Sequence, residues 1–215
     1  MKFEIRQRCD LLREDETQHV VPWRFTIKAG ADDPNGFEEY TVGRILADEL
    51  RPFELAEWGT NVWDVADSDS AGLLAAYSAL LDKSGHFREL EFDAIGEPIV
   101  YMYRFELHPD FAHWRLAILD CFCRRFLDNA LILVQYHSTW LSLAEFELLG
   151  FRVLAPSEFA PPTDAAEIDA SIRFMVRDNT QTTPLSISDY PKEVPWATID
   201  HARWVKSKGP WHFNM

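Results

Sequence analysis

The chain has 215 residues, of which 47% are hydrophobic, so it is long and apolar enough to build one sizeable core. Its net charge of -14 argues against binding to nucleic-acid backbones, because proteins that bind phosphates in this way carry a basic face. No run of about 18 apolar residues is present, and the N-terminus is too charged for a signal peptide. We therefore expect a soluble, cytoplasmic protein that binds neither nucleic acid nor membranes.

The cysteines and histidines do not form a recognisable ligand pattern. Cys121 and Cys123 lie two positions apart on a predicted helix, where their side chains diverge, and Cys9 is distant in sequence. The seven histidines are scattered, without the spacing that places two ligands on one helical face. We expect neither a disulfide framework nor a metal site.

The first half of the chain predicts strands followed by a helix. Residues 3–8 alternate apolar and charged side chains, and the runs 20–29 and 40–46 flank a turn-rich Asp-Asp-Pro-Asn-Gly stretch, so these two runs are expected to pair in antiparallel fashion. Asp69 or Ser70 can cap a helix that Gly85 ends. The apolar residues of that helix recur at spacings of three and four: Leu73, Leu74, Tyr77, Leu80 and Leu81. The segment from Leu46 to Asp67 is left open between helix and loop.

The second half alternates strands and helices. Apolar runs at 98–107, 130–136 and 151–156 predict strands, and the first two read as buried. A helix is expected at 116–127, and a second begins at a cap supplied by Ser138 or Thr139 and ends at Gly150. This β-α-β-α-β order predicts a sheet with at least one parallel crossover, and residues 172–177 predict one more strand.

A single mixed α/β domain, with a mixed central sheet flanked by helices, accounts for residues 1–178. Residues 179–215 show no clear period and are expected to form an irregular, extended C-terminal arm packed on the domain or on a partner. Three of the eight tryptophans, Trp196, Trp204 and Trp211, lie in that arm. Such residues either pin an arm onto its own domain or form a partner-binding surface.

Two short motifs carry a resemblance to a known family. The strand ending Leu-His-Pro-Asp-Phe at 107–111 and the segment Phe-Glu-Leu-Leu-Gly-Phe at 146–151 are separated by one helix and one strand. In this order and spacing they resemble the second half of the GNAT acyltransferase superfamily, over about a quarter of the chain. The resemblance implies a GNAT-like fold that binds acetyl-CoA or another acyl-CoA.

The turn between the strand and the helix departs from that family's pattern. There an Arg/Gln-x-x-Gly-x-Gly/Ala turn wraps the CoA pyrophosphate, whereas here Ala112 and Arg115 stand at the first two of those positions and only Ala117 keeps a small residue. A helix beginning near Arg115 or Leu116 still offers free N–H groups to an anion. Two interpretations stay open: Arg115 or His113 contacts the phosphates directly, or Trp114 and His113 fill the site.

The resemblance implies where a cofactor would lie. It would cross Leu107 to Ala117, with its pantetheine between the strands at 99–107 and 130–136. The candidate cofactor-binding residues are Leu107, His113, Trp114, Arg115, Leu116, Ala117 and Phe146.

The catalytic groups are less familiar. The family often uses a tyrosine on the later helix as general acid, and Phe146 stands there with no proton to give. Tyr136 is a candidate to replace it, and Glu106 or His137 is a candidate general base.

The first functional hypothesis is therefore N-acyl transfer from acyl-CoA to a small amine or a protein amine. The alternative is a catalytically inactive GNAT-fold protein that acts as a binding or interaction module, with a homodimer left open. A third hypothesis is that another anionic ligand binds at the same helix end, because a fold does not determine function.

Overall fold

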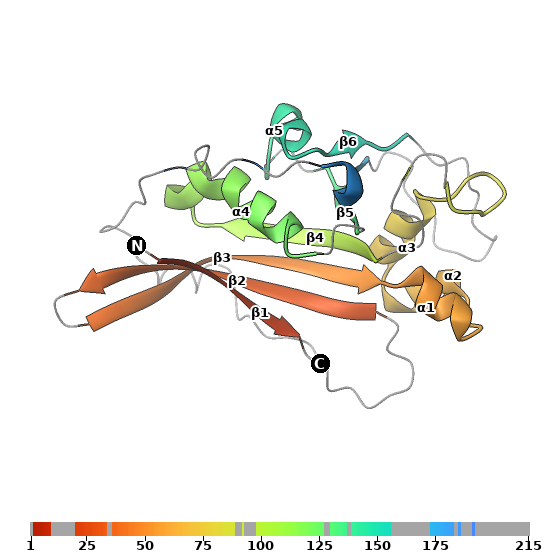
Figure 1. The fold of residues 1–215 in the computed structure, drawn as a ribbon, viewed down its shortest axis with the longest axis horizontal. Helices are drawn as coiled ribbons and strands as arrows, with labels where there is room; N and C mark the ends of the chain where they lie inside the picture. Colours follow the sequence, from red (N-terminus) through yellow and green to blue (C-terminus); the bar gives the residue numbers. More distant parts are fainter. Residues whose placement is uncertain are drawn as a thin grey trace.

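The computed structural model describes residues 2–9, 20–33, 36–88, 92, 98–126, 130–136, 139–155, 173–182, 185 and 191 (Figure 1). Within these residues seven strands form one mixed sheet in the order β1-β2-β3-β4-β5-β7-β6. The strands are β1 (Lys2–Cys9), β2 (Val20–Asp33), β3 (Gly36–Leu50), β4 (Ile99–Leu107), β5 (Leu131–Gln135), β6 (Arg152–Val153) and β7 (Phe174–Asp178). The helices are α1 (Pro52–Glu57), α2 (Val62–Asp69), α3 (Ala71–Ser78), α4 (Arg115–Cys123) and α5 (Leu143–Leu148). The protein is thus a mixed α/β structure, as the sequence predicts.

The first four strands of the sheet pair with one another in antiparallel fashion. The predicted pairing of 20–29 with 40–46 is confirmed, and β2 and β3 are both longer than the apolar runs that predicted them. The ladder continues through the polar residues on either side of the turn because backbone hydrogen bonds need no apolar side chain. Long strands therefore carry the first half of the sheet (Figure 1).

The second half contains the predicted parallel crossover. β4 and β5 pair in parallel and are connected through α4, after which β7 pairs antiparallel with β5 and holds β6 at the edge. The cap of α5 differs from the prediction: it is Ser142, whose side chain accepts from the backbone N–H of Glu145, and not Ser138 or Thr139. Ser142 meets Glu145 in a capping box, a pairing that outcompetes a cap three or four residues earlier.

Three short helices fill the segment between β3 and β4. α1 and α2 occupy most of the stretch that the sequence left undecided, and Ser70 caps α3 by accepting from the backbone N–H of Leu73, as predicted. α3 ends at Ser78, well before Gly85, so the predicted length of this helix is wrong. Leu81 instead forms a β-bridge with Phe87, a tertiary contact that overrides the helical period.

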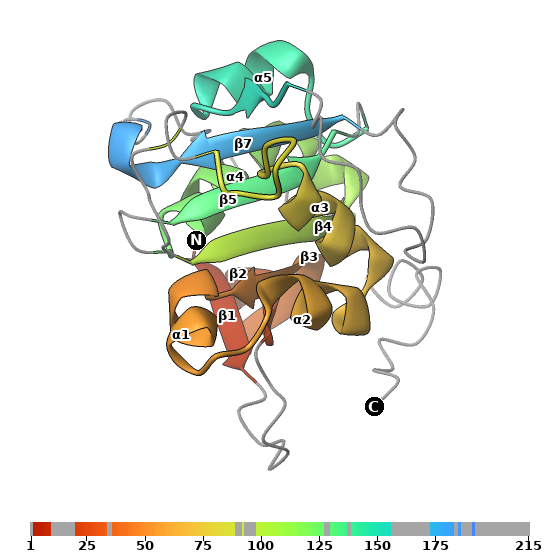
Figure 2. The same ribbon diagram turned by 90° about the vertical axis from the view of Figure 1, so that its right-hand side faces the viewer.

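Helices cover both faces of the sheet. In Figure 2, α1, α2 and α3 lie in front of the sheet and α4 lies behind it. One apolar core packs α4 and α5 against side chains such as Phe25, Val100 and Ile132, and the other packs α1 to α3 against side chains such as Leu50 and Leu131. Residues that alternate along β3, β4 and β5 therefore serve different cores.

Two earlier expectations concern the C-terminal arm and the lack of membrane-spanning segments. Of the C-terminal segment 179–215, the structure describes 179–182, 185 and 191, so the predicted arm lies almost wholly outside the described residues. Among the helices of the described ranges, none has the length and apolar character needed to cross a membrane.

Candidate functional site

The turn after β4 is helical rather than an open loop. Residues Pro109–Trp114 form a 3₁₀ helix, η2, which continues directly into α4. His108 caps η2 through Nδ1, which accepts from the backbone N–H of Asp110, and the N–H of Arg115 donates to the carbonyl of Ala112. The predicted start of the helix at Arg115 is confirmed, but the first turn of α4 follows another helical turn. Its N–H groups are therefore less open to an anion than those of an isolated helix.

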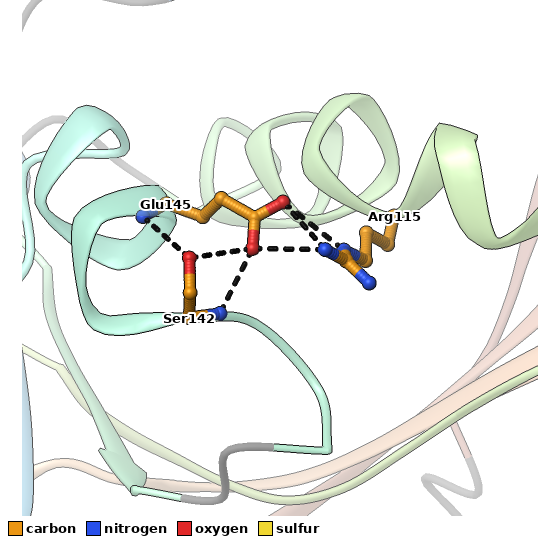
Figure 3. Close-up of polar contacts among 3 residues, drawn as sticks. All are labelled: Arg115, Ser142 and Glu145. Carbon is orange, nitrogen blue, oxygen red and sulfur yellow. Dashed lines mark hydrogen bonds and ion pairs between the residues drawn. The ribbon is translucent and has the colours of Figure 1, made fainter.

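Arg115 is held by the start of α5. Its Nη2 lies 2.8 Å and 3.0 Å from the two carboxylate oxygens of Glu145, and its Nε lies 3.1 Å from Oε1. Glu145 also accepts from the backbone N–H and hydroxyl of Ser142, so one carboxylate closes the capping box and binds the guanidinium (Figure 3). Burial alone raises the pKa of Glu145, but the hydrogen bonds from Ser142 and Arg115 outweigh it and hold that pKa below its usual value.

The other expected cofactor-binding residues divide into three groups by burial. His113 is exposed, Ala117 is buried, and Phe146 is buried in the core on the α4 side of the sheet. The remaining three, Leu107, Trp114 and Leu116, are partly buried and pack against the same core. Phe146 lies among aromatic rings, 6.1 Å from the ring of Tyr136 and 5.4 Å from that of Phe151.

The expected catalytic residues are not gathered at one point. Glu106 pairs with Arg44, its Oε2 lying 2.5 Å from Nε, and Arg104 lies 3.9 Å from its other oxygen. Tyr136 packs on the α4 side of the sheet, while Glu106 alternates with the buried Phe105 and so faces the other side. His137 lies outside the described residues.

The parallel pairing of β4 and β5 stops halfway along β4. Their ladder runs from Ile99 beside Leu131 to Met102 beside Val134. Just beyond, Ala47 of β3 pairs with Met102 and Leu46 pairs with Arg104, so Tyr103 is an extra residue that forms a β-bulge. In the part of the chain that the structure describes, no strand pairs with β4 on its β5 side between Tyr103 and Leu107.

Next to this bulge lies a group of four side chains that we name the carboxylate–tyrosine cluster: Asp48 of β3, Asp69 at the end of α2, and Tyr101 and Tyr103 of β4. Asp48 lies directly across the ladder from Tyr101. The rings of Tyr101 and Tyr103 are 6.0 Å apart between centroids. Asp48 and Tyr101 have only 9% and 4% of their surface exposed, whereas Asp69 and Tyr103 are exposed.

Burial and mutual repulsion raise the pKa values of the cluster. Removal from water, followed by the charge of Asp69, raises the pKa of Asp48 to about 7, although Arg24 acts in the opposite direction. Burial and the charge of Asp48 raise the pKa of Tyr101 to about 12, and the same causes come first in raising that of Tyr103 to about 12. A carboxyl group that titrates near neutral pH can accept a proton at that pH, which is what a general base must do.

Sequence reasoning missed this cluster. Asp48 interrupts the apolar end of β3, between Ala47 and Leu50, and so stands among residues that are all buried. A carboxylate inside a buried run is rare enough to be a signal. Its association with Asp69 and Tyr101, however, depends on long-range pairing that no local pattern encodes.

The cluster places one buried carboxyl group and one buried tyrosine side by side within the described residues. In the same ranges no three His, Cys, Asp or Glu side chains gather so that they could hold a metal ion. Comparison with known proteins finds no matching family model, no matching curated protein and no matching solved structure.

Proposed function

We propose that the chain is a GNAT-like N-acyltransferase that moves an acyl group from acyl-CoA to an amine. The observation that carries the proposal is the end of the β4–β5 ladder at Met102, with the bulge at Tyr103 and four further residues of β4 beyond the bulge. The resemblance in sequence expects pantetheine between these same two strands. The helix that follows β4, α4, begins where the resemblance expects the pyrophosphate.

An extended amide chain suits the edge of β4. Pantetheine carries two amide groups. On its β5 side, the stretch of β4 beyond Met102 has no partner strand among the described residues, so its N–H and C=O groups can pair with such a chain in the manner of an added strand. Binding there needs no glycine in the turn, because the contacts come from β4 rather than from the loop. Arg115, at the position where the family has a glycine, therefore weakens the expected contacts with the pyrophosphate but leaves the expected contacts with pantetheine.

The transfer itself needs a proton acceptor. In the proposed step the amine lone pair attacks the thioester carbonyl carbon, the new C–N bond forms, and the C–S bond breaks. The ammonium form of the acceptor first gives one proton to a base, which frees the lone pair. The second proton, which the nitrogen loses after the attack, passes to the departing thiolate to form the CoA thiol. Asp48 is the proposed base, because its pKa is about 7 and it lies directly across the ladder from Tyr101, which precedes the bulge by two residues.

The test is calorimetric titration with acetyl-CoA, followed by an assay for free CoA thiol in the presence of an amine. We expect micromolar binding and thiol release that depends on both protein and amine. Acetyl-pantetheine, which lacks the nucleotide, should keep a measurable part of the affinity if β4 supplies the main contacts. Folded protein that gives no heat with millimolar acetyl-CoA and releases no thiol would contradict the proposal.

One observation favours a second function, the binding module without catalysis. The helical turn and the engagement of Arg115 by Glu145 both occupy the place of a phosphate-binding loop. In addition, Phe53 and Trp58 of the α1 region are 53% and 64% exposed, as side chains at interaction surfaces often are. The same titration separates the two functions, because the module would bind no acyl-CoA.

A further inference from the structure

The carboxylate of Asp48 is buried without a hydrogen-bond partner. Only 9% of the residue is exposed, and the described residues provide it no hydrogen bond, although the positive charge of Arg24 acts on it. A carboxylate in this state has lost most of its hydration and is still within reach of a small ligand.

Tyr101 provides a second, independent indication of a ligand site. Only 4% of the residue is exposed, yet its hydroxyl has no hydrogen-bond partner in the part of the chain described. The ring lies against Gly72, at the start of α3 and next to the joint between α2 and α3. Any side chain at residue 72 would press on this ring, since a Cβ there would lie 3.2 Å from the hydroxyl oxygen.

The surrounding charges favour a cation. The carboxylates of Asp48 and Asp69 both make the local electrostatic potential more negative. The nearby arginines are already engaged: Arg104 lies 3.9 Å from Glu106, and Arg24 has interactions of its own. The rings of Tyr101 and Tyr103 are tilted by 42° to each other, and Tyr103 is 39% exposed, so its ring can attract a positive charge.

We propose that the carboxylate–tyrosine cluster binds the primary ammonium group of an organic cation whose stem carries no carboxylate. An ammonium group has three donors and no acceptor, which suits an unpartnered carboxylate and two tyrosine oxygens. A carboxylate on the ligand would add a third negative charge beside Asp48 and Asp69. The cluster thus selects plain alkyl or aryl amines over amino acids.

The binding of the ammonium group stands without acyl transfer. Its use as the acceptor site of an acyltransferase rests on the proposed function, because only then does Asp48 receive the proton that the bound ammonium must lose before it attacks. The experiment therefore measures cation binding first, with no acyl-CoA present, and acylation second.

The probes are butylammonium chloride and its matched analogue 4-aminobutyrate, titrated into the full chain while the carboxyl carbon of Asp48 is followed by NMR. Butylammonium should lower the apparent pKa of Asp48, and Asp48→Asn should weaken its binding about tenfold or more. Asp67→Asn on α2, an exposed residue, gives the same change in net charge and should leave the affinity unchanged. Tyr103→Phe, which keeps the ring, should weaken binding less than Asp48→Asn.

Three results would overturn the inference: equal binding of 4-aminobutyrate, equal losses in Asp48→Asn and Asp67→Asn, or no effect of butylammonium on Asp48. Binding of the cation without any acylation would leave the site in place and refute the proposed function. Acylation that proceeds unchanged in Asp48→Asn would leave the proposed function in place and refute the site. Circular dichroism of each variant shows that it is folded before either comparison is made.

Discussion

Asp120 of α4 and Arg177 of β7 face each other inside the protein, with Nη1 of the arginine 3.7 Å from Oδ1 of the aspartate. Both side chains are at most 2% exposed. Arg177 also donates to the carbonyl of Leu149 and to Asn179, and Arg124 reaches the other oxygen of Asp120 from the helix surface. This buried network ties α4 to β7 and to the end of α5.

Asp120→Ala should therefore destabilise the protein strongly. The change leaves the guanidinium of Arg177 buried without a counter-charge, a loss that costs about 3–5 kcal/mol of unfolding free energy. Arg124→Ala removes a partner of the same carboxylate that is 33% exposed, so its cost should stay at about 1 kcal/mol or less. Urea denaturation of the two variants makes the comparison, and equal losses would contradict a special role for burial.

Glu145→Gln should increase the affinity of the turn for inorganic pyrophosphate. Glutamine preserves a capping box with Ser142, while the loss of charge releases Arg115 for another anion. Because the pair is partly exposed, the gain should be modest, about fivefold or less. Isothermal titration measures it, and Glu147→Gln, exposed on the same helix, is the matched control. An equal gain in both variants would mean that net charge, and not Arg115, controls binding.

The stability of the protein should fall as the pH rises from about 4 to about 7. Asp48 has a pKa of about 7 when folded, against the ordinary value of 3.8, so in this window the native state binds more protons than the unfolded state. Asp48→Asn should flatten the profile and stabilise the protein above neutral pH, by on the order of 1.4 kcal/mol for each unit of pKa difference. Denaturant titrations across the window test this, and a wild-type profile that rises there would contradict it.

Gly43→Ala should lower stability without any change in charge. A Cβ at this position would lie 2.6 Å from the carbonyl oxygen of Glu106 and 2.9 Å from Cδ1 of Ile27, and the carbonyl belongs to the backbone of β4. The strands must move apart to accommodate it, at a cost of about 1–3 kcal/mol. Thermal unfolding measures the shift, and an unchanged midpoint would show that β3 and β4 separate freely.

The sequence predicted those parts of the fold that depend on neighbouring residues. Apolar runs at 98–107 and 130–136 predicted β4 and β5, and the choice of Asp69 or Ser70 as a cap predicted the start of α3. Both kinds of prediction succeed because periodicity and capping act within a few residues. α1 and α2, of six and eight residues, were left undecided because helices this short carry too little periodicity to detect.

The candidate site was predicted less well because its contacts span the chain. Arg115 was expected to be available to a phosphate, and its partner Glu145 lies 30 residues away on another helix. Glu106 was considered as a free base, and the arginine that pairs with it lies 62 residues earlier. Asp48 escaped notice because its importance comes from having few partners, a property that only the folded chain reveals.

The bulge at Tyr103 also shifts the alternation of side chains along β4. Met102 and Phe105 both belong to the core on the α4 side although three positions separate them, which strict alternation forbids. If the same residues alternated regularly, with no bulge to accommodate Tyr103, the end of the strand would turn over. Phe105 would then point toward Asp48's side of the sheet, and Arg104 and Glu106 would enter the α4 core. One residue thus sets the orientation of every side chain from the bulge to the turn.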